Sequence, residues 1–576
     1  MKEETYPPTE RNTPMKLNHK RPLCALLAAV MMLACGCGDN GSSSDTADSG
    51  SSSGDSSSAD GGNASGGDAV VTRQREDIPL DPVTETRGDF DLSDVQNKSD
   101  VPEDFSLFFE GEAGKMSENT KEISFDKYGK YSGTGFAAIG NKDETLEFEG
   151  EFPADGAYDF IMNTAVSNGT SENFIAIDGE NVTSFSVEGN TFHEVAASKV
   201  QVTKGKHKIA IKAKTGSFFV DTLTVKGAAP VDLTQYEIDK TLCNPNATDE
   251  TKRLYSFMCD VYGKYIISGQ YADKNRGVDS AEFSEYDYKL GKYPAIMGLD
   301  LIEASPSRVA NGSSPGNIVQ VAEDWYLNRG GIVTICWHWN APEPYLGVNG
   351  AAWWEGFYKD KTSFNLKKAL SGEDKEGYDY LIRDIDSIAM YLQELDDYHV
   401  PVLWRPLHEG GGDPKWNNPW FWWGSSGAEA YKELWKLMYD RLTNVHHCNN
   451  LIWVWNGQNL DYYPGDEYVD MMGYDSYPEV KDDHSPQKGL WDYTASTTPT
   501  KKILAMTENG AIPDPDACMS EGIRWSYFCT WNGEFALKDA QLGCESNSYE
   551  FFEKIMNHER VLTLDELPDI KSWPIE

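Results

Sequence analysis

Residues 400–424 read VPVLWRPLHEGGGDPKWNNPWFWWG and indicate the fold class of the second half of the chain. The stretch opens with an apolar run typical of a buried strand, and Arg405, His408 and Glu409 follow where that strand ends. Glycines at 410–412 then lead into a loop that carries Trp416, Trp420, Trp422 and Trp423. A rigid strand that presents a carboxylate beside flat indole rings is typical of the C-terminal rim of a barrel enzyme. The alternative is a salt-bridged strand end beside a cluster of core aromatic rings.

Strand and helix patterns alternate on both sides of this stretch, from residue 229 to residue 576. Apolar segments that read as strands lie at 266–271, 295–301, 331–339, 400–409, 450–456, 468–477, 502–510 and 522–531. Amphipathic helices separate some of them; before the fourth strand, one helical face carries Leu381, Ile385, Ile388, Leu392 and Leu395. This repeat predicts an α/β domain with the (β/α)8 TIM-barrel fold at 229–576.

Two glutamates stand at strand ends of this predicted barrel. Glu409 ends the fourth strand, and Glu508 ends the seventh in the segment ILAMTENG. Two carboxylates on one rim suit glycoside hydrolysis, in which one donates a proton to the leaving oxygen and the other attacks the anomeric carbon or activates water. Glutamate pairs are common in a chain with 92 Asp and Glu residues, so the shared strand-end placement is what makes this pair a candidate.

Residues 105–228 show a different pattern, in which short runs alternate apolar and polar residues between turn signals. Examples are TLEFE at 145–149, YDFIM at 158–162 and KIAIK at 208–212. A period of two is typical of half-buried strands, and their spacing predicts an all-β jelly-roll sandwich. All 17 tryptophans of the chain lie from Trp325 onward, so this region contains none.

The first hundred residues indicate an export signal and a tether. Basic residues between 16 and 21 precede an apolar run at 23–34, which is too short for a comfortable membrane span. The order Leu33-Ala34-Cys35 resembles a bacterial lipobox, which implies lipidation at Cys35 rather than Cys37. We expect 1–35 to be a lipoprotein signal peptide, with Met15 as the alternative start to Met1. Residues 36–104, rich in Ser, Gly and Asp, are then a flexible linker.

Net charge limits the classes of binding partner, and the cysteines limit the possible disulfides and zinc sites. A formal net charge of −41 excludes nucleic acid and anionic membrane surfaces as partners, because phosphate would be repelled. We expect a monomer that is exported and either lipid-anchored to the cell envelope, at the outer-membrane surface, or secreted, with the lipid as its only membrane contact. The seven cysteines from Cys243 onward are odd in number, so at least one is unpaired, and they lack the CxxC spacing of zinc sites.

Five motifs of the barrel region resemble glycoside hydrolase family 26. In chain order they are WHWN at 337–340, WRPLHE at 404–409, WFWWG at 420–424, GYDSY at 473–477 and TENG at 507–510. That family is a group of retaining (β/α)8 barrels dominated by endo-β-1,4-mannanases. The resemblance implies that Glu409 is the acid/base and Glu508 the nucleophile, and that catalysis needs no cofactor.

The same resemblance implies a set of substrate-binding residues. Tyr474 would orient the nucleophile, Trp531 would form the stacking floor, and His338 with Trp339 would meet sugar next to the cleaved bond. Segment 410–419 is longer than in many members and adds Trp416. The full predicted set is His338, Trp339, Arg405, His408, Trp416, Trp423, Tyr474 and Trp531. The alternatives are a core position for His338, a core position for Trp423 and a hydrogen bond within the barrel for Tyr474.

The β region resembles carbohydrate-binding modules of families 35 and 6, on FEGEA at 109–113, YSGTGF at 131–136 and VDTL at 220–223. In that group the opening acids and the late aspartate hold a structural calcium ion, which implies this role for Glu110, Glu112 and Asp221. Carboxylate oxygens are suitable ligands for calcium. The alternative is three surface acids. Because the region has no tryptophan, any sugar stacking there falls to Tyr or Phe.

These features together predict a retaining endo-β-1,4-mannanase that cleaves internal linkages of mannan, glucomannan or galactomannan. Alternatives on the same barrel are a β-1,3-xylanase, a mixed-linkage glucanase and a mannobiose-releasing exo-enzyme. A different class of protein, an inactive glycan-binding surface lipoprotein, is the further alternative.

Overall fold

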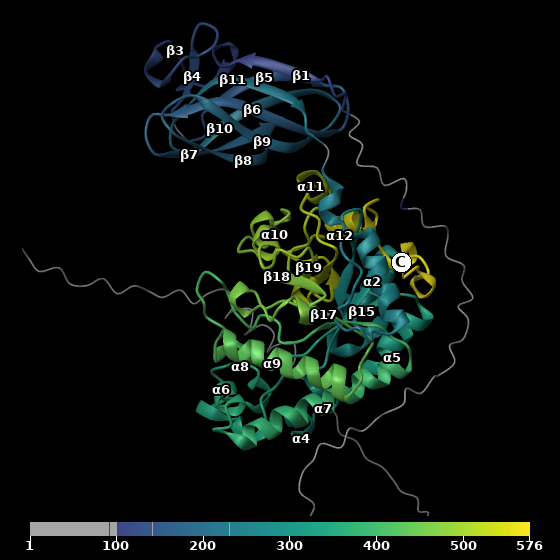
Figure 1. Ribbon diagram of the computed structural model, residues 1–576. Helices are drawn as coiled ribbons and strands as arrows, with labels where there is room; N and C mark the ends of the chain where they lie inside the picture. Colours follow the sequence, from purple (N-terminus) through teal and green to yellow (C-terminus); the bar gives the residue numbers. More distant parts are fainter. Residues whose placement is uncertain (1–91, 93–100, 141, 230, 576) are drawn as a thin grey trace, which may run out of the picture. The chain divides into compact units, whose positions relative to one another are not determined.

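The computed structural model describes residues 92, 101–140, 142–229 and 231–575. These residues form an antiparallel β-sandwich, and then an α/β unit with a closed parallel barrel (Figure 1). The predicted fold class is therefore confirmed. The predicted signal peptide, Cys35 and the linker up to residue 100, except residue 92, lie outside the described residues.

The sandwich consists of two antiparallel sheets. One has the strand order β3-β4-β11-β6-β9 with β1 paired to β11, and the other has the order β2-β5-β10-β7-β8. The strands are β1 (Ser106–Glu110), β2 (Lys115–Met116), β3 (Lys121–Ile123), β4 (Phe136–Ile139), β5 (Thr145–Phe152), β6 (Gly156–Val166), β7 (Thr170–Ile177), β8 (Glu180–Glu188), β9 (His193–Val202), β10 (Gly205–Thr215) and β11 (Phe218–Gly227).

Alternation along these strands creates the core of the sandwich. In β6, Tyr158, Phe160 and Met162 are buried, whereas the residues between them are only partly covered. These side chains pack in one cluster with residues of the other sheet, among them Ile209 and Ile211 of β10. Full burial of each large apolar side chain stabilises the fold by roughly 1.5–3 kcal/mol.

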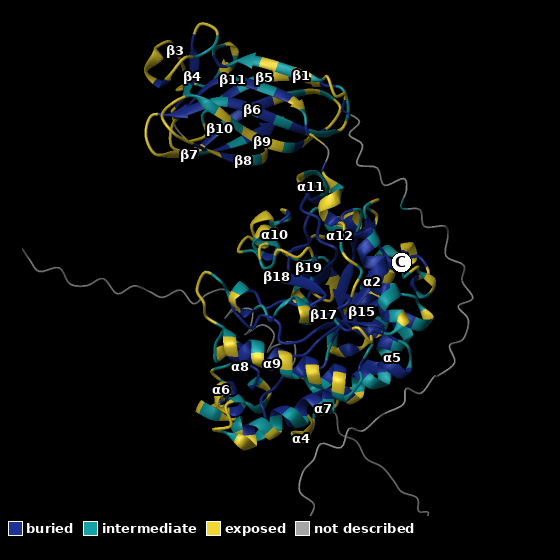
Figure 2. Ribbon diagram, in the orientation of Figure 1, coloured by how far each residue is buried: buried dark blue, intermediate teal, exposed yellow. Residues whose placement is uncertain are grey.

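The barrel closes through its eight strands in chain order, from β13 to β20. The strands are β13 (Gly269–Tyr271), β14 (Ile296–Asp300), β15 (Ile332–Cys336), β16 (Val402–Arg405), β17 (Leu451–Trp455), β18 (Met471–Ser476), β19 (Ile503–Asn509) and β20 (Phe528–Thr530). Every residue of β15, β17 and β19 is buried, as expected for parallel strands covered on both faces, and the centre of the barrel is dark blue in Figure 2.

Helices follow most of the strands. They are α2 (Asp249–Val261), α3 (Ala281–Leu290), α4 (Pro306–Ala310), α5 (Ile318–Glu323), α6 (Leu366–Leu370), α7 (Lys375–Asp397), α8 (Trp422–Ser425), α9 (Ala428–Asp440), α10 (Lys488–Ala495), α11 (Pro515–Glu521) and α12 (Tyr549–Met556). The predicted apolar face before the fourth strand is the buried face of α7. Between β17 and β18 the chain makes only short 3-10 turns, so this connection departs from the regular repeat.

All eight predicted strands are shorter in the structure, and three of them differ for a reason that the backbone shows. The first divides into β12 (Ile266–Ile267), which pairs with β23 (Val561–Leu562), and β13. The eighth loses its first part because α11 ends at Gly522, whose φ of 72° forms a left-handed helix cap. The fourth ends at Arg405, because Leu407 and Glu409 adopt φ of 52°, which a strand does not accommodate.

Two further features concern the export and cysteine predictions. Across the described part of the chain, no helix is both long and apolar enough to cross a membrane. Cys243, Cys259, Cys336, Cys448, Cys518, Cys529 and Cys544 all carry free thiols.

Candidate active site

Glu409 lies in a strained turn just beyond β16. Its backbone N–H donates to the carbonyl oxygen of Asn456, which follows β17, at 2.7 Å. Both Leu407 and Glu409 have a positive φ that is uncommon for residues other than glycine. Backbone strain of this kind persists only where the surroundings enforce it, and it is concentrated at functional sites.

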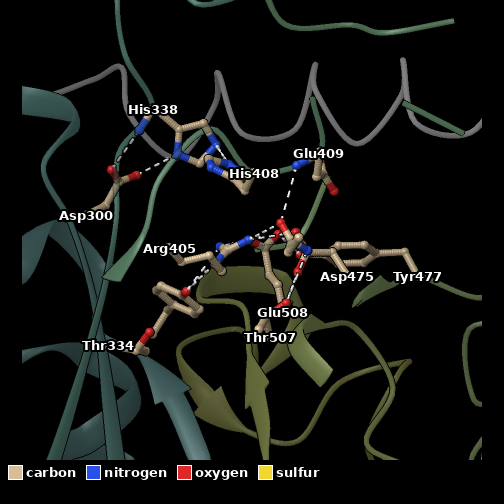
Figure 3. A network of polar contacts seen from close by, with 12 residues as sticks. Asp300, Thr334, His338, Arg405, His408, Glu409, Asp475, Tyr477, Thr507 and Glu508 are labelled. Carbon is tan, nitrogen blue, oxygen red and sulfur yellow. Dashed lines mark hydrogen bonds and ion pairs between the residues drawn. The ribbon is translucent and has the colours of Figure 1, made fainter. Parts of the chain in front are cut away.

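Glu508 lies on β19 itself and is buried. Nη2 of Arg405 donates to its Oε2 at 2.6 Å, and the hydroxyl of Tyr477 donates to its Oε1 (Figure 3). With one donor on each oxygen, the carboxylate is fixed in both position and orientation. This is the arrangement that a carboxylate nucleophile requires.

The two glutamates approach each other closely. One carboxylate oxygen each of Glu409, Asp475 and Glu508 lies within 4.8 Å of the other two. Retaining glycosidases hold their two carboxyl groups about 5–5.5 Å apart, whereas inverting enzymes need about 6.5–9.5 Å to admit a water molecule. The spacing fits direct attack by Glu508 and a covalent intermediate.

The surroundings of Glu409 favour its protonated form. Burial raises the pKa of Glu409 well above its usual value, and the carboxylates of Asp475 and Glu508 raise it further. The indole N–H of Trp420 donates to Oε2 of Glu409 at 2.7 Å and opposes this effect. A carboxyl group that is protonated near neutral pH can act as a general acid.

Two histidines lie close to each other near the turn that carries Glu409. The Nε2 atoms of His338 and His408 are 3.1 Å apart, and Nδ1 of His338 lies 2.6 Å from Oδ2 of Asp300 (Figure 3). Burial, then His338 and Arg405, lower the pKa of His408, so its imidazole is neutral. A neutral neighbour adds no positive charge that would promote the ionisation of Glu409.

The hydroxyl that donates to the Glu508 carboxylate is that of Tyr477, so the orienting contact predicted for Tyr474 falls to Tyr477. Asp475 and Tyr477 contact Arg405 and Glu508 directly. The strand pairing shifts between Tyr474 and Asp475, and Tyr474 lies near Asp413 and Glu409 instead.

Trp339 and Trp423 also differ from their predicted role, because both are buried in the barrel wall. The indole N–H of Trp339 donates to Oδ2 of Asp384, and its ring stacks on Trp337 at 4.2 Å between ring centres. The indole N–H of Trp423 donates to the carbonyl oxygen of His408. Trp423 therefore supports the turn that carries Glu409 rather than offering a stacking face to sugar.

Of the two remaining predicted tryptophans, Trp531 lies at the site and Trp416 lies in an exposed loop. Trp531 follows β20 and packs against the rings of Tyr271 and His338, at 4.7 and 5.7 Å between centres. It is therefore at the site, next to the floor formed by Arg405 and Tyr271. Trp416 stands in the long loop after Glu409 with 61% of its surface exposed.

Several site residues had no role in the prediction from sequence. Oδ2 of Asp475 accepts from Nη1 of Arg405 at 2.7 Å. The carbonyl oxygen of Asn456 accepts from the backbone N–H of Glu409, and the indole N–H of Trp420 donates to the Glu409 carboxylate. Asp475 and Tyr477 belong to the GYDSY motif, and their spacing of two residues was the signal that could have identified them. The contact of Trp420 depends on loop geometry, for which the sequence carries no comparable signal.

The predicted calcium ligands fit the ion only in part. Oε2 of Glu110 and Oε2 of Glu112 are buried without a hydrogen-bond partner, as expected for oxygens that could face a cation. The other oxygen of each accepts from the loop at Ser132 and Thr134. Both oxygens of Asp221 accept from N–H groups, those of Ser132 and Asn163, so its carboxylate is already satisfied.

Besides the three carboxylates at Glu409, Asp475 and Glu508, a group of three different side chains in the barrel domain could hold a metal ion. Asp300, Cys336 and His338 each place one ligand atom within 4.8 Å of the others. Asp300 and His338 already satisfy each other by a hydrogen bond, and burial followed by Asp300 raises the pKa of the Cys336 thiol well above its usual value. Metal ligation would require the thiolate, so these side chains favour the hydrogen-bonded state.

Comparison with known proteins adds independent information. The model of "Glycosyl hydrolase family 26" matches residues 243–566, and that of "Carbohydrate binding module (family 35)" matches residues 108–228. The mannan endo-1,4-beta-mannosidase of Thermothelomyces thermophilus is 35% identical over 475 residues, which are 82% of this chain and 92% of that protein. Mannan endo-1,4-beta-mannosidase B of Piromyces sp is 33% identical, over 80% of this chain and 77% of that protein.

Solved structures lead to the same group. A Podospora anserina GH26-CBM35 β-(1,4)-mannanase shares 33% identity with a TM-score of 0.66, over 81% of this chain and 99% of that one. A ruminal GH26 endo-β-1,4-mannanase shares 29% identity with a TM-score of 0.60, over 81% and 98%. Because the family model spans more than half of the chain and its range includes the paired glutamates of the barrel rim, the chain belongs to glycosyl hydrolase family 26.

Proposed function

We propose that this protein is a retaining endo-β-1,4-mannanase that cleaves internal linkages of mannan, glucomannan or galactomannan by double displacement. The observation that carries the proposal is the close approach of Glu409, whose pKa burial raises, to a fixed Glu508 carboxylate on one barrel rim. The mannan specificity is supported by the names of the similar proteins, which are mannan endo-1,4-beta-mannosidases.

In the first step Glu409 gives its proton to the glycosidic oxygen as the bond from that oxygen to the anomeric carbon breaks. An oxygen of Glu508 forms a new bond to the same carbon, which yields a glycosyl ester and releases the leaving sugar. The donors from Arg405 and Tyr477 hold Glu508 in line for this attack.

In the second step a water molecule replaces the leaving sugar. Glu409, now ionised, takes a proton from this water while the water oxygen bonds to the anomeric carbon and the ester bond to Glu508 breaks. The product keeps the original anomeric configuration, and both glutamates return to their starting states.

The test is release of reducing sugar from mannan, glucomannan, galactomannan, β-1,3-xylan and mixed-linkage β-glucan, together with the size of the products. We expect oligosaccharides of mixed length from the mannans, and loss of that activity in Glu508→Ala with the fold retained. Preference for xylan or glucan, or mannobiose as the sole early product, would select one of the alternative enzymes. Binding of mannan with no hydrolysis would instead indicate the glycan-binding protein.

We further propose that the chain is exported and lipid-anchored at Cys35, on the basis of the basic, apolar and Leu33-Ala34-Cys35 sequence order. Fatty-acid labelling of the expressed protein, with Cys35→Ala and Cys37→Ala compared, tests this proposal. Labelling that survives Cys35→Ala would contradict it. Light scattering of the protein without residues 1–35 tests the expected monomer. The same measurement with nucleic acid added tests the expected absence of a nucleic-acid partner.

For the sandwich we propose a structural calcium ion held by Glu110 and Glu112, whose buried free oxygens support it. Calcium should raise the thermal midpoint of residues 105–228 and a chelator should lower it, because an ion that binds only the folded state stabilises that state. Glu112→Gln should abolish the difference, whereas Asp221→Asn should reduce it less. An equal midpoint with and without calcium would contradict the proposal.

A further inference from the structure

We propose that Asp475 is a positioning residue that keeps Glu409 in its acid form by offsetting the charge of Arg405. This inference deepens the proposed function and rests on it, because it concerns the same site. Asp475 does not reach a reacting atom in the two chemical steps. Its effect is exerted through the number of charges in a buried pocket.

The contacts of Asp475 place a third carboxylate next to those of Glu409 and Glu508. Its Oδ2 accepts from Nη1 of Arg405 at 2.7 Å, and its Oδ1 accepts from the hydroxyl of Thr507 at 2.8 Å (Figure 3). One of its oxygens lies within 4.8 Å of an oxygen of Glu409 and of Glu508. Arg405 is fully buried and forms its other ion pair with Glu508. One guanidinium therefore pairs with two of the three carboxyl groups.

A charge count explains why this arrangement matters. Burial raises the pKa of Asp475 to about 7, with Arg405 lowering it and Glu508 raising it. Above that pH, with Glu409 protonated, the pocket holds two carboxylates and one guanidinium, so its net charge is one negative. A second ionised glutamate would make it two negative in a site with little water, which is unfavourable. If Asp475 were neutral, the same ionisation would change the pocket only from zero to one negative.

The count also stays constant through the reaction. When Glu508 forms the glycosyl ester it loses its charge, and the ionisation of Glu409 restores one negative charge. Asp475 therefore prevents premature ionisation in the free enzyme yet permits it in the intermediate. Without Asp475, the charge of Arg405 would be balanced by Glu508 alone, and Glu409 would lose its proton at lower pH.

Other ionisable groups around the pocket do not replace this effect. Burial raises the pKa of Tyr474 and Tyr477, and it lowers that of His408, so these three are uncharged at neutral pH. Burial also raises the pKa of four further neighbours, which are therefore neutral: Tyr271, Tyr527, Cys336 and Cys529. His338 with its partner Asp300, and Asp413 in the loop beyond Glu409, lie near this part of the barrel as well. Burial is the first cause of the raised pKa of Glu409, and Asp475 is the first of its charged neighbours to contribute.

The test is the pH dependence of kcat/KM on mannan for Asp475→Asn. The alkaline limb reports ionisation of the acid in the free enzyme. We expect it to move to lower pH by about one unit or more, the usual effect of one close charge. The midpoint of the limb does not depend on the fraction of active protein, so partial unfolding does not imitate the shift. In Asp475→Glu, which keeps the charge, the limb should return toward its original position.

Two further variants separate charge from structure. Thr507→Val removes the hydroxyl that donates to Asp475 and accepts from Nδ2 of Asn456. Loss of the donor makes Asp475 easier to protonate, so the limb should move in the same direction by less. The matched control is Asp470→Asn. Asp470 is another buried aspartate, it directly precedes the start of β18, and its carboxylate accepts from the backbone N–H groups of Cys243 and Trp453. This substitution should lower the thermal midpoint and leave the limb where it is.

The outcomes are distinguishable from failure of the proposed function. If the wild-type protein does not hydrolyse mannan, the proposed function is wrong. If the wild type is active and folded Asp475→Asn and Thr507→Val keep the original alkaline limb, Asp475 only supports Arg405 and the inference is overturned. If Asp475→Asn does not fold, the result for Thr507→Val decides.

Discussion

At the scale of single residues, Glu409 has to give up and regain one proton in each turnover. Replacing it with alanine should reduce hydrolysis of mannan by about 10²–10⁴-fold, the usual contribution of general acid–base catalysis. A substrate with an activated phenolate leaving group needs little protonation, so its first step should survive. A burst of phenol followed by slow turnover should appear, and azide should accelerate the second step.

The same experiment can also contradict the role of Glu409. Equal losses on mannan and on the activated substrate, without a burst and without azide rescue, would show that Glu409 is not the acid/base. Glu508→Ala is the matched comparison, because removal of the nucleophile should abolish the burst as well.

The contact between Tyr477 and Glu508 gives a second prediction at this scale. Tyr477→Phe removes one hydrogen bond to a charged group, worth about 1.5–3 kcal/mol, and should lower kcat by roughly 10–100-fold. Tyr474→Phe is the comparison, since the sequence predicts this contact for Tyr474. Steady-state kinetics on mannan compare them, and a larger loss in Tyr474→Phe would return the orienting role to Tyr474.

At the scale of elements, the wall between β15 and α7 decides the role of Trp339. Its indole donates to Asp384, whose pKa burial raises to about 6 while Arg383 opposes the rise. Trp339→Phe leaves that buried acceptor with one donor fewer and should reduce the free energy of unfolding by about 1–3 kcal/mol. Urea denaturation measures this change, while KM on mannan should stay the same. Unchanged stability with a strongly raised KM would place Trp339 in the sugar-binding cleft.

The elements also explain what the sequence predicts well. Eight buried strands and the apolar face of α7 follow from periodicity, and the confirmed fold class follows from their order. Side-chain direction within a motif is harder to predict. Trp337, His338 and Trp339 are consecutive, and only the structure shows that His338 meets the site while both tryptophans enter the wall.

Turn geometry is the other limit on prediction from sequence. The turn with positive φ at Leu407 and Glu409 is held by a hydrogen bond from Glu409 to a distant strand end, at Asn456, which no local propensity encodes. Trp420 likewise reaches Glu409 from eleven residues further along the chain. Charge sharing at Arg405 likewise depends on three strands, β16, β18 and β19, meeting at one rim.

At the scale of the whole molecule, the catalytic residues all belong to the barrel, between Asp300 and Trp531. The sandwich has its own core. Deleting residues 105–228 should therefore leave turnover of soluble mannan within about twofold, because each unit of this size can fold around its own core. Comparison of kcat/KM for the two proteins measures this, and loss of most turnover in a well-folded barrel would show that the sandwich contributes to the site.

The most direct test of the account is to identify the residue that becomes covalently bound to sugar. In a 2-deoxy-2-fluoro β-mannosyl or β-mannobiosyl fluoride, the fluorine at C2 slows both steps, while the good leaving group speeds only the first. The glycosyl-enzyme therefore accumulates. Peptide mass spectrometry should then find one added sugar on the carboxylate of Glu508. Sugar attached to Glu409 or Asp475, or no covalent adduct while the enzyme still turns over mannan, would contradict the account.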